Sequence, residues 1–148
     1  MYQYQVGFLQ AVTRAFKNYC NFKGRASRSE FWWFYLFTYI VGMLFCGPYV
    51  METFSNALNG IETVEFSTWT GVAYLWSLFI LLPQLGLLFR RLHDSGRSGW
   101  NWLWLFLPVI GTIILLVYLC TASQPFANKY GEVPNLENPP VPGQEQNF

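Results

Sequence analysis

The sequence predicts an all-α membrane protein in which three transmembrane helices follow an amphipathic helix that lies in the membrane interface. Composition is the first reason: 53% of the 148 residues are hydrophobic and only 11% are charged, against about 25% in a typical soluble domain. Second, the chain contains three long stretches without a charged residue. Third, eight of the nine Lys and Arg residues fall on one side of the three-span arrangement. The composition excludes a disordered chain and a solenoid and argues strongly against a soluble globule.

Residues 1–20 are predicted to form the interfacial helix. Apolar side chains recur there every three or four residues, which is the spacing of one helix face, and Arg14 and Lys17 lie off this stripe. The stripe consists of Tyr4, Phe8, Val12, Phe16 and Tyr19. Such a helix typically lies along a membrane surface. A helix that docks on a soluble partner has the same pattern, so both interpretations stay open.

The three uncharged stretches are residues 31–51, 66–89 and 100–120. Each reaches the roughly 20 residues that a membrane-spanning helix needs, and none shows the polar stripe of a soluble core helix. Gln84 is predicted to hydrogen-bond another helix. Each stretch holds one proline that can kink or end its helix, namely Pro48, Pro83 and Pro108.

Residues 1–120 therefore form the predicted membrane domain, and residues 121–148 form a tail. The tail contains few apolar residues and five prolines. A segment of this composition cannot bury enough apolar surface to fold, so the tail is predicted to be disordered.

The positions of the basic residues predict the orientation. Five of them precede residue 31 and three lie in the loop between the second and third stretches, whereas residues 52–65 hold none. Short basic flanks stay in the cytoplasm. The N-terminus is therefore predicted to be cytoplasmic and the C-terminus periplasmic.

The sequence predicts no metal site and no bound cofactor. Its three cysteines lie far apart, and with a single histidine they cannot form a zinc site of the usual spacing. The absence of charged residues inside the three stretches disfavours ion-coupled transport, which usually depends on them.

Residues 90–100, with the sequence RRLHDSGRSGW, concentrate the polar chemistry of the chain and allow three interpretations. In the first the loop is structural, and Glu30 and Asp94 form ion pairs with nearby arginines. In the second it binds an anionic lipid headgroup, because the planar guanidinium group suits phosphate. The candidate headgroup ligands are Arg25, Arg28, Arg90, Arg91, Arg97, Ser95 and Ser98.

In the third interpretation His93 and Asp94 act in catalysis. Adjacent residues on a helix point in different directions, so the pair alone is not a catalytic dyad. No catalytic residue is therefore predicted.

Four segments carry a resemblance to a known family: KNYCNFKGRASRSEFWWF at 17–34, RRLHDSGRSGWNWL at 90–103, PVIG at 108–111 and NKYGE at 128–132. In this order they resemble a small bacterial inner-membrane family catalogued as domain of unknown function 805. Ser95 stands where the family usually has Thr, and Glu132 where it usually has Pro. The resemblance implies a location in the bacterial inner membrane and no particular activity.

The predicted function is that of a non-enzymatic, multi-pass inner-membrane protein. It would support envelope maintenance by binding anionic lipids, a membrane-protein partner or another copy of itself, and it would not bind nucleic acid. Two alternatives stay open: a subunit of a small oligomeric transporter or channel, and an enzyme that acts on lipid headgroups.

Overall fold

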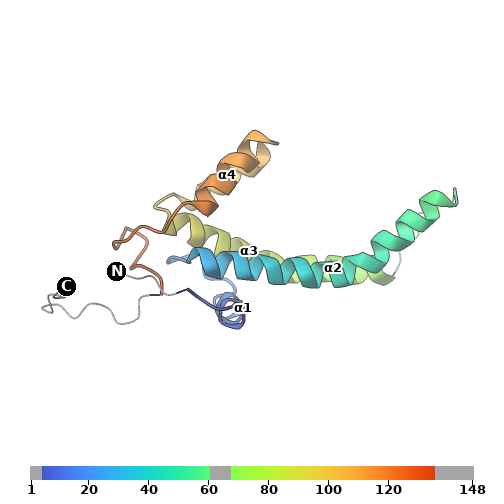
Figure 1. Cartoon of the computed structure of the whole chain (residues 1–148), viewed down its shortest axis with the longest axis horizontal. Helices are drawn as coiled ribbons and strands as arrows, with labels where there is room; N and C mark the ends of the chain where they lie inside the picture. The colour runs from blue at the N-terminus through green and yellow to red at the C-terminus, as the bar shows by residue number, and fades with distance from the viewer. Residues whose placement is uncertain (1–4, 61–67, 136–148) are drawn as a thin grey trace, which may run out of the picture.

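The computed structural model describes residues 5–60 and 68–135, and every regular element in these ranges is helical. Helices α2 and α3 lie side by side, α1 crosses them near one end, and η1 and α4 splay away from that same end (Figure 1). We call this end, where α2 begins and α3 ends, the basic end. The elements are α1 (Phe8–Lys17), α2 (Arg28–Leu58), α3 (Thr68–Asp94), the 3₁₀ helix η1 (Gly99–Phe106) and α4 (Ile110–Cys120).

Helices α2 and α3 have the length and apolar composition of membrane spans. In their most apolar windows only 11% and 22% of the residues are buried inside the molecule. A core helix of a soluble protein would be mostly buried, so the exposed apolar surface here is what lipid covers. The predicted spans 31–51 and 66–89 fall on these two helices, except for residues 66 and 67, which lie outside the described residues.

Helix α2 is longer than the predicted span. Its 31 residues correspond to about 46 Å at 1.5 Å per residue, whereas the hydrocarbon core is about 30 Å thick. It begins at the Ser27 cap, whose hydroxyl accepts a hydrogen bond from the Glu30 amide. It continues past the far end of α3 and bends in its distal half, which contains Pro48 (Figure 1).

Helix α1 occupies the middle of the predicted helix 1–20, whose residues 1–4 lie outside the described residues. It is seen almost end-on in Figure 1, so it runs across α2 and α3. Ala11 and Ala15 are fully buried, and their small side chains let α1 approach α2 closely. Phe16 packs edge-on against Phe34 and stacks on Phe79. The apolar face of α1 therefore packs on the two long helices at the basic end.

The third stretch, residues 100–120, is not one continuous helix. It forms a hairpin of η1 and α4, and α4 has only 11 residues, or about 16 Å. This is roughly half of the hydrocarbon thickness, so the prediction of a third continuous span is not supported. The break falls at Pro108 and Val109, where Val109 takes a positive φ of 64°. We call residues 99–120 the hairpin.

The hairpin returns the chain to the basic end. The carbonyl oxygen of Leu119, near the end of α4, lies 3.0 Å from Arg91 Nε, near the end of α3. Residues 121–135 consequently lie beside the segments that precede α2 and follow α3 (Figure 1). The placement of the N-terminal and C-terminal segments on opposite sides of the membrane stays a prediction, and this geometry favours the same side for residues 25 and 124–126. In the tail that is predicted to be disordered, Thr121 and Gln124 accept hydrogen bonds from Arg91 and Arg25, and residues 136–148 lie outside the described residues.

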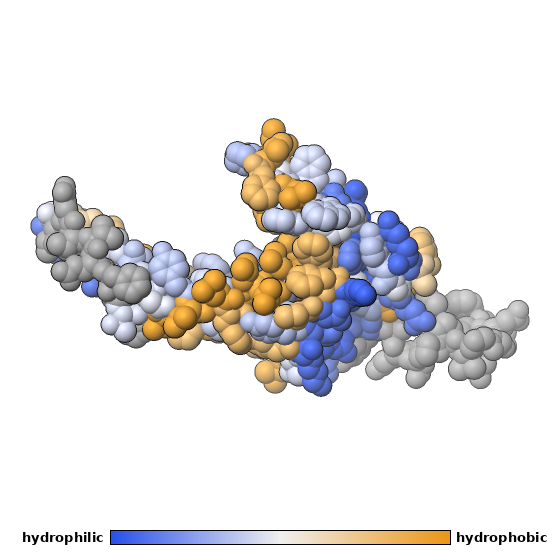
Figure 2. Space-filling view, turned by 180° about the vertical axis from the view of Figure 1, so that it is seen from behind, coloured by the Kyte–Doolittle hydropathy of each residue, from blue (hydrophilic) through white to orange (hydrophobic). Residues whose placement is uncertain are grey.

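The surface of the molecule is also divided into an apolar part and a polar part. Hydrophobic side chains cover the middle of the molecule, and hydrophilic side chains gather toward the basic end (Figure 2). A membrane would accommodate the hydrophobic part and leave the basic end at its surface.

Gly111 is the residue that lets the hairpin close. A Cβ atom at this position would lie 1.8 Å from the backbone oxygen of Trp104, and backbone cannot move aside cheaply. We expect Gly111→Ala to lower the free energy of unfolding by about 1–3 kcal/mol, the usual cost of overpacking. Thermal unfolding in detergent measures this effect.

Gly47→Ala is the matched control, because a Cβ atom there meets nothing within 4 Å. Equal melting temperatures for the two variants would contradict the tight hairpin.

Candidate functional site

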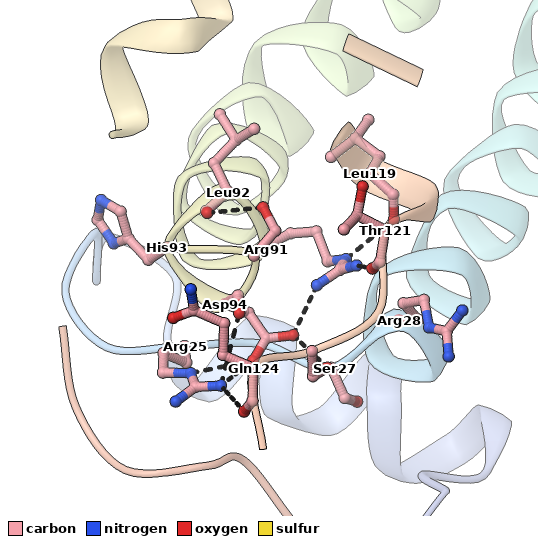
Figure 3. A network of polar contacts seen from close by, with 12 residues as sticks. Arg25, Ser27, Arg28, Arg91, Leu92, His93, Asp94, Leu119, Thr121 and Gln124 are labelled. Atoms are coloured by element: carbon pink, nitrogen blue, oxygen red, sulfur yellow. Dashed lines mark hydrogen bonds and ion pairs between the residues drawn. The ribbon is translucent and has the colours of Figure 1, made fainter. Parts of the chain in front are cut away.

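Three segments that are distant in the sequence meet at the basic end. The last turn of α3 contributes Arg91 and Asp94, the segment before α2 contributes Arg25, and the chain after α4 contributes Gln124. We call Arg25, Arg91 and Asp94 the arginine–aspartate network (Figure 3).

Asp94 lies at the centre of the network and is fully buried. Its Oδ1 accepts hydrogen bonds from Arg25 Nε at 3.0 Å and forms an ion pair with Arg25 Nη2 at 2.9 Å. Its Oδ2 accepts from Arg91 Nη1 at 2.6 Å and from the Ser123 hydroxyl. Both carboxylate oxygens are thus satisfied, which is the condition under which a buried charge is tolerated.

The two arginines also bind backbone carbonyls of the chain that follows α4. Arg25 donates to the carbonyl oxygens of Gln124 at 2.6 Å and Phe126 at 2.8 Å. Arg91 donates to those of Leu119 and Thr121. The last carbonyls of a helix have no partner within it and carry the negative end of its dipole. The network therefore attaches the end of α4 and residues 121–126 to α3.

A second buried ion pair joins α2 to α3. Arg90 Nη1 lies 3.2 Å from Glu30 Oε1, and each side chain is 5% exposed. The Arg90 carbonyl accepts a hydrogen bond from the Ala26 amide at 3.1 Å. Arg90 Nε and Nη2 are buried and have no hydrogen-bond partner within the described part of the chain.

The structure does not bring the seven predicted headgroup ligands together in one site. Arg25, Arg90 and Arg91 are buried in ion pairs. The Ser95 hydroxyl donates to the Leu92 carbonyl, and the Ser98 hydroxyl caps η1 by accepting from the Trp100 amide.

Two of the seven remain exposed, Arg28 and Arg97. The Arg97 guanidinium lies 3.6 Å from the centre of the Tyr118 ring. Arg28 Nη1 lies 3.4 Å from the Cys120 carbonyl oxygen, and its guanidinium turns away from the network (Figure 3).

His93 and Asp94 point in different directions, as Figure 3 shows. The His93 ring stacks on the Tyr130 ring at 3.8 Å between centroids, and its Nδ1 lies 3.3 Å from the Gly24 carbonyl oxygen. Within the described residues, no group of three or more His, Cys, Asp and Glu side chains is placed to hold a metal ion. The geometry thus gives His93 a packing role at the basic end.

Sequence reasoning missed the contribution of residues 121–135 to this site. Asn128 Nδ2 donates to the His93 carbonyl at 3.0 Å and to Gln124 Oε1 at 2.8 Å. The available signal was the NKYGE segment, which carried part of the family resemblance inside a region predicted to be disordered.

Two long apolar helices, a short hairpin and a buried charge network at one end define a small multi-pass α-helical membrane protein. Residues 19–132 match the family model described as Protein of unknown function (DUF805), and the chain belongs to this family. No solved structure matches the chain.

Two relatives in Escherichia coli (strain K12) are similar to this chain over almost their whole length. Inner membrane protein YhaI is 36% identical over 128 residues, which cover 86% of this chain and 98% of YhaI. Inner membrane protein YhaH is 36% identical over 129 residues, which cover 84% and 95%. The chain is accordingly an inner-membrane protein of an uncharacterised family.

Proposed function

We propose that this protein is a non-enzymatic component of the inner membrane that binds anionic phospholipid at its basic end and so contributes to envelope maintenance. In this proposal the basic end faces the cytoplasm, and residues 121–135 lie there together with the N-terminal segment. The positive-inside rule supports this side, because the basic flanks of α2 and α3 meet at this end.

One observation carries the proposal. Some cations at the basic end are buried in ion pairs, whereas others at the same end are exposed and have no carboxylate partner among the described residues. The ion pairs of the described residues use Arg25, Arg90 and Arg91. Besides Lys129, which lies over the Tyr130 ring, four exposed cations at the same end have no carboxylate partner in that part of the chain: Lys17, Lys23, Arg28 and Arg97. We call these four the exposed cations.

Each basic residue near an anionic membrane surface contributes about 1 kcal/mol of binding, which salt screens. The exposed cations together therefore favour phosphatidylglycerol over a zwitterionic lipid. Arg25 and Arg91 cannot serve in this way without losing their carboxylate and carbonyl partners, and Arg90 is buried in its ion pair with Glu30.

The test is the lipid that stays bound during purification. We expect the parent protein to retain phosphatidylglycerol in preference to phosphatidylethanolamine, and we expect replacement of all four exposed cations by Gln to remove this preference. Mass spectrometry of the bound lipids, at low and high salt, measures it.

The control for this experiment is Glu52→Gln, which changes an exposed charge in the distal half of α2 and should leave the preference unchanged. A parent protein that retains both lipids equally would refute the proposal.

A further inference from the structure

A cavity of about 380 Å³ lies where α2, α3 and the hairpin meet. Its volume falls in the range of roughly 300–1,000 Å³ that small-molecule sites occupy. Phe31 of α2, Leu88 of α3 and Leu119 of α4 contribute to its walls. The wall is mostly apolar and comes from α2, α3, η1 and α4, so a single alkyl chain in the cleft would be enclosed on several sides. We call this cavity the cleft.

Two polar side chains, Gln84 of α3 and Thr112 of α4, line the cleft. Neither side chain forms a hydrogen bond to another described residue, so the predicted interhelical bond of Gln84 is not formed among them. Gln84 lies seven residues before Arg91 on α3, or about 10 Å along the helix axis. An amide at this depth can donate to the ester carbonyl of a lipid whose phosphate lies at the level of the basic end.

Arg28 lies close to the end of the cleft that is nearest the basic end. It lies one turn before Trp32, which lines the cleft, and next to Cys120, which follows the lining residue Leu119. Arg28 is exposed and has no carboxylate partner among the described residues. An apolar cleft with an exposed guanidinium near its end, which has no carboxylate partner among the described residues, matches an amphipathic anion in both charge and polarity.

We propose that the cleft binds one acyl chain of an anionic phospholipid, with the phosphate on Arg28 and an ester carbonyl on Gln84. This proposal rests on the proposed function and specifies the site at which the anionic lipid binds. A second copy of the chain fits the cleft less well, because its own basic end would come next to Arg28 and add like charge.

The first test compares two tryptophan variants on adjacent positions of α4. Leu116 lines the cleft and Val117 does not, while both side chains are about half exposed to lipid, at 46% and 58%. We expect Leu116→Trp to weaken binding of phosphatidylglycerol about tenfold, as when about two methylene groups are kept out of an apolar site. Val117→Trp should bind like the parent. Native mass spectrometry of the detergent-purified protein titrated with phosphatidylglycerol measures both.

A second pair tests the end of the cleft that lies close to Arg28. We expect Arg28→Gln to weaken binding of phosphatidylglycerol about fivefold or more, since one charged contact near the membrane surface is lost. Lys23→Gln removes an exposed charge at the same end and should have a smaller effect. Equal losses in the two variants would mean that diffuse charge alone attracts the lipid, and this would overturn the site.

The outcomes of these tests distinguish a failure of the cleft proposal from a failure of the proposed function. A parent protein without a preference for anionic lipid refutes the proposed function and the cleft together. A parent with the preference, and with equal binding by Leu116→Trp and Val117→Trp, refutes the cleft alone. A change of oligomeric state in Leu116→Trp without a change in lipid binding would assign the cleft to self-association and also overturn the proposal.

A labelling experiment on the parent protein keeps the proposal testable even where a variant fails to fold. Phosphatidylglycerol with a diazirine in its acyl chain is activated by light in native membranes, and the labelled residues are found by mass spectrometry. We expect label at Leu88 and Leu116, which line the cleft. Label confined to outward-facing positions such as Ile113 and Val117, exposed by 57% and 58%, would overturn the site.

Discussion

Replacing Asp94 with Asn is expected to lower the free energy of unfolding by about 3–5 kcal/mol, the cost of breaking a buried ion pair by removing one partner. Asp94 is the carboxylate that both Arg25 and Arg91 contact, and all three side chains are 1% exposed or less. The amide of Asn would leave two guanidinium groups buried without an opposing charge. We expect a large fall in melting temperature in detergent and a low yield of monodisperse protein.

Glu132→Gln is the matched control. It removes one carboxylate from the same end of the molecule, but Glu132 is exposed and forms no ion pair within the described residues. Exposed substitutions of this kind usually change stability by less than about 0.5 kcal/mol. An Asp94→Asn variant that unfolds at the temperature of the parent would show that the network does not hold the basic end together.

Hydropathy was sufficient to predict the two long helices, but it did not predict the break in the third stretch that forms the hairpin. Residues 100–120 are uncharged, like residues 31–51 and 66–89, so no composition window distinguishes them. The prolines do not distinguish them either: Pro48 and Pro83 lie inside continuous helices, whereas the helix is interrupted at Pro108.

What differs at Pro108 is its surroundings. Gly111 allows the backbone of α4 to pass close to the Trp104 carbonyl, and Arg91 binds the carbonyl of Leu119 after the chain has turned back. Both are tertiary contacts, and neither has a pattern in the linear sequence. A tight turn in an apolar stretch is therefore hidden from reasoning that depends on composition and length.

The charges of the site were easier to find than its geometry. Counting charges indicates that Glu30 and Asp94 lie among arginines, and the structure places Glu30 beside Arg90 and Asp94 beside Arg25 and Arg91. The same count treats the remaining arginine donors as free for phosphate. Backbone carbonyls occupy many of them instead, and a carbonyl oxygen is present at every residue, so it leaves no trace in composition.

The hairpin also leads to a prediction about topology: a reporter that is active only in the cytoplasm, fused after Phe148, is expected to be active. Arg25 precedes α2, and it binds the carbonyls of Gln124 and Phe126, which follow α4. Residues 25 and 124–126 must therefore lie on the same side of the membrane. In the proposed orientation the basic end lies in the cytoplasm, because eight basic residues flank the helices there.

The opposite arrangement would require α4, with 11 residues, to cross a hydrocarbon core of about 30 Å. It would also leave Arg25 and Arg91 without their carbonyl partners in a partly apolar setting, where an unsatisfied charged donor costs several kcal/mol. The control is the same reporter inserted after Leu58, the last residue of α2, where it should be silent. A silent fusion after Phe148, combined with activity of a reporter that works only in the periplasm, would show that the chain crosses the membrane a third time and that the contacts of Arg25 and Arg91 with residues 119–126 do not form in the membrane.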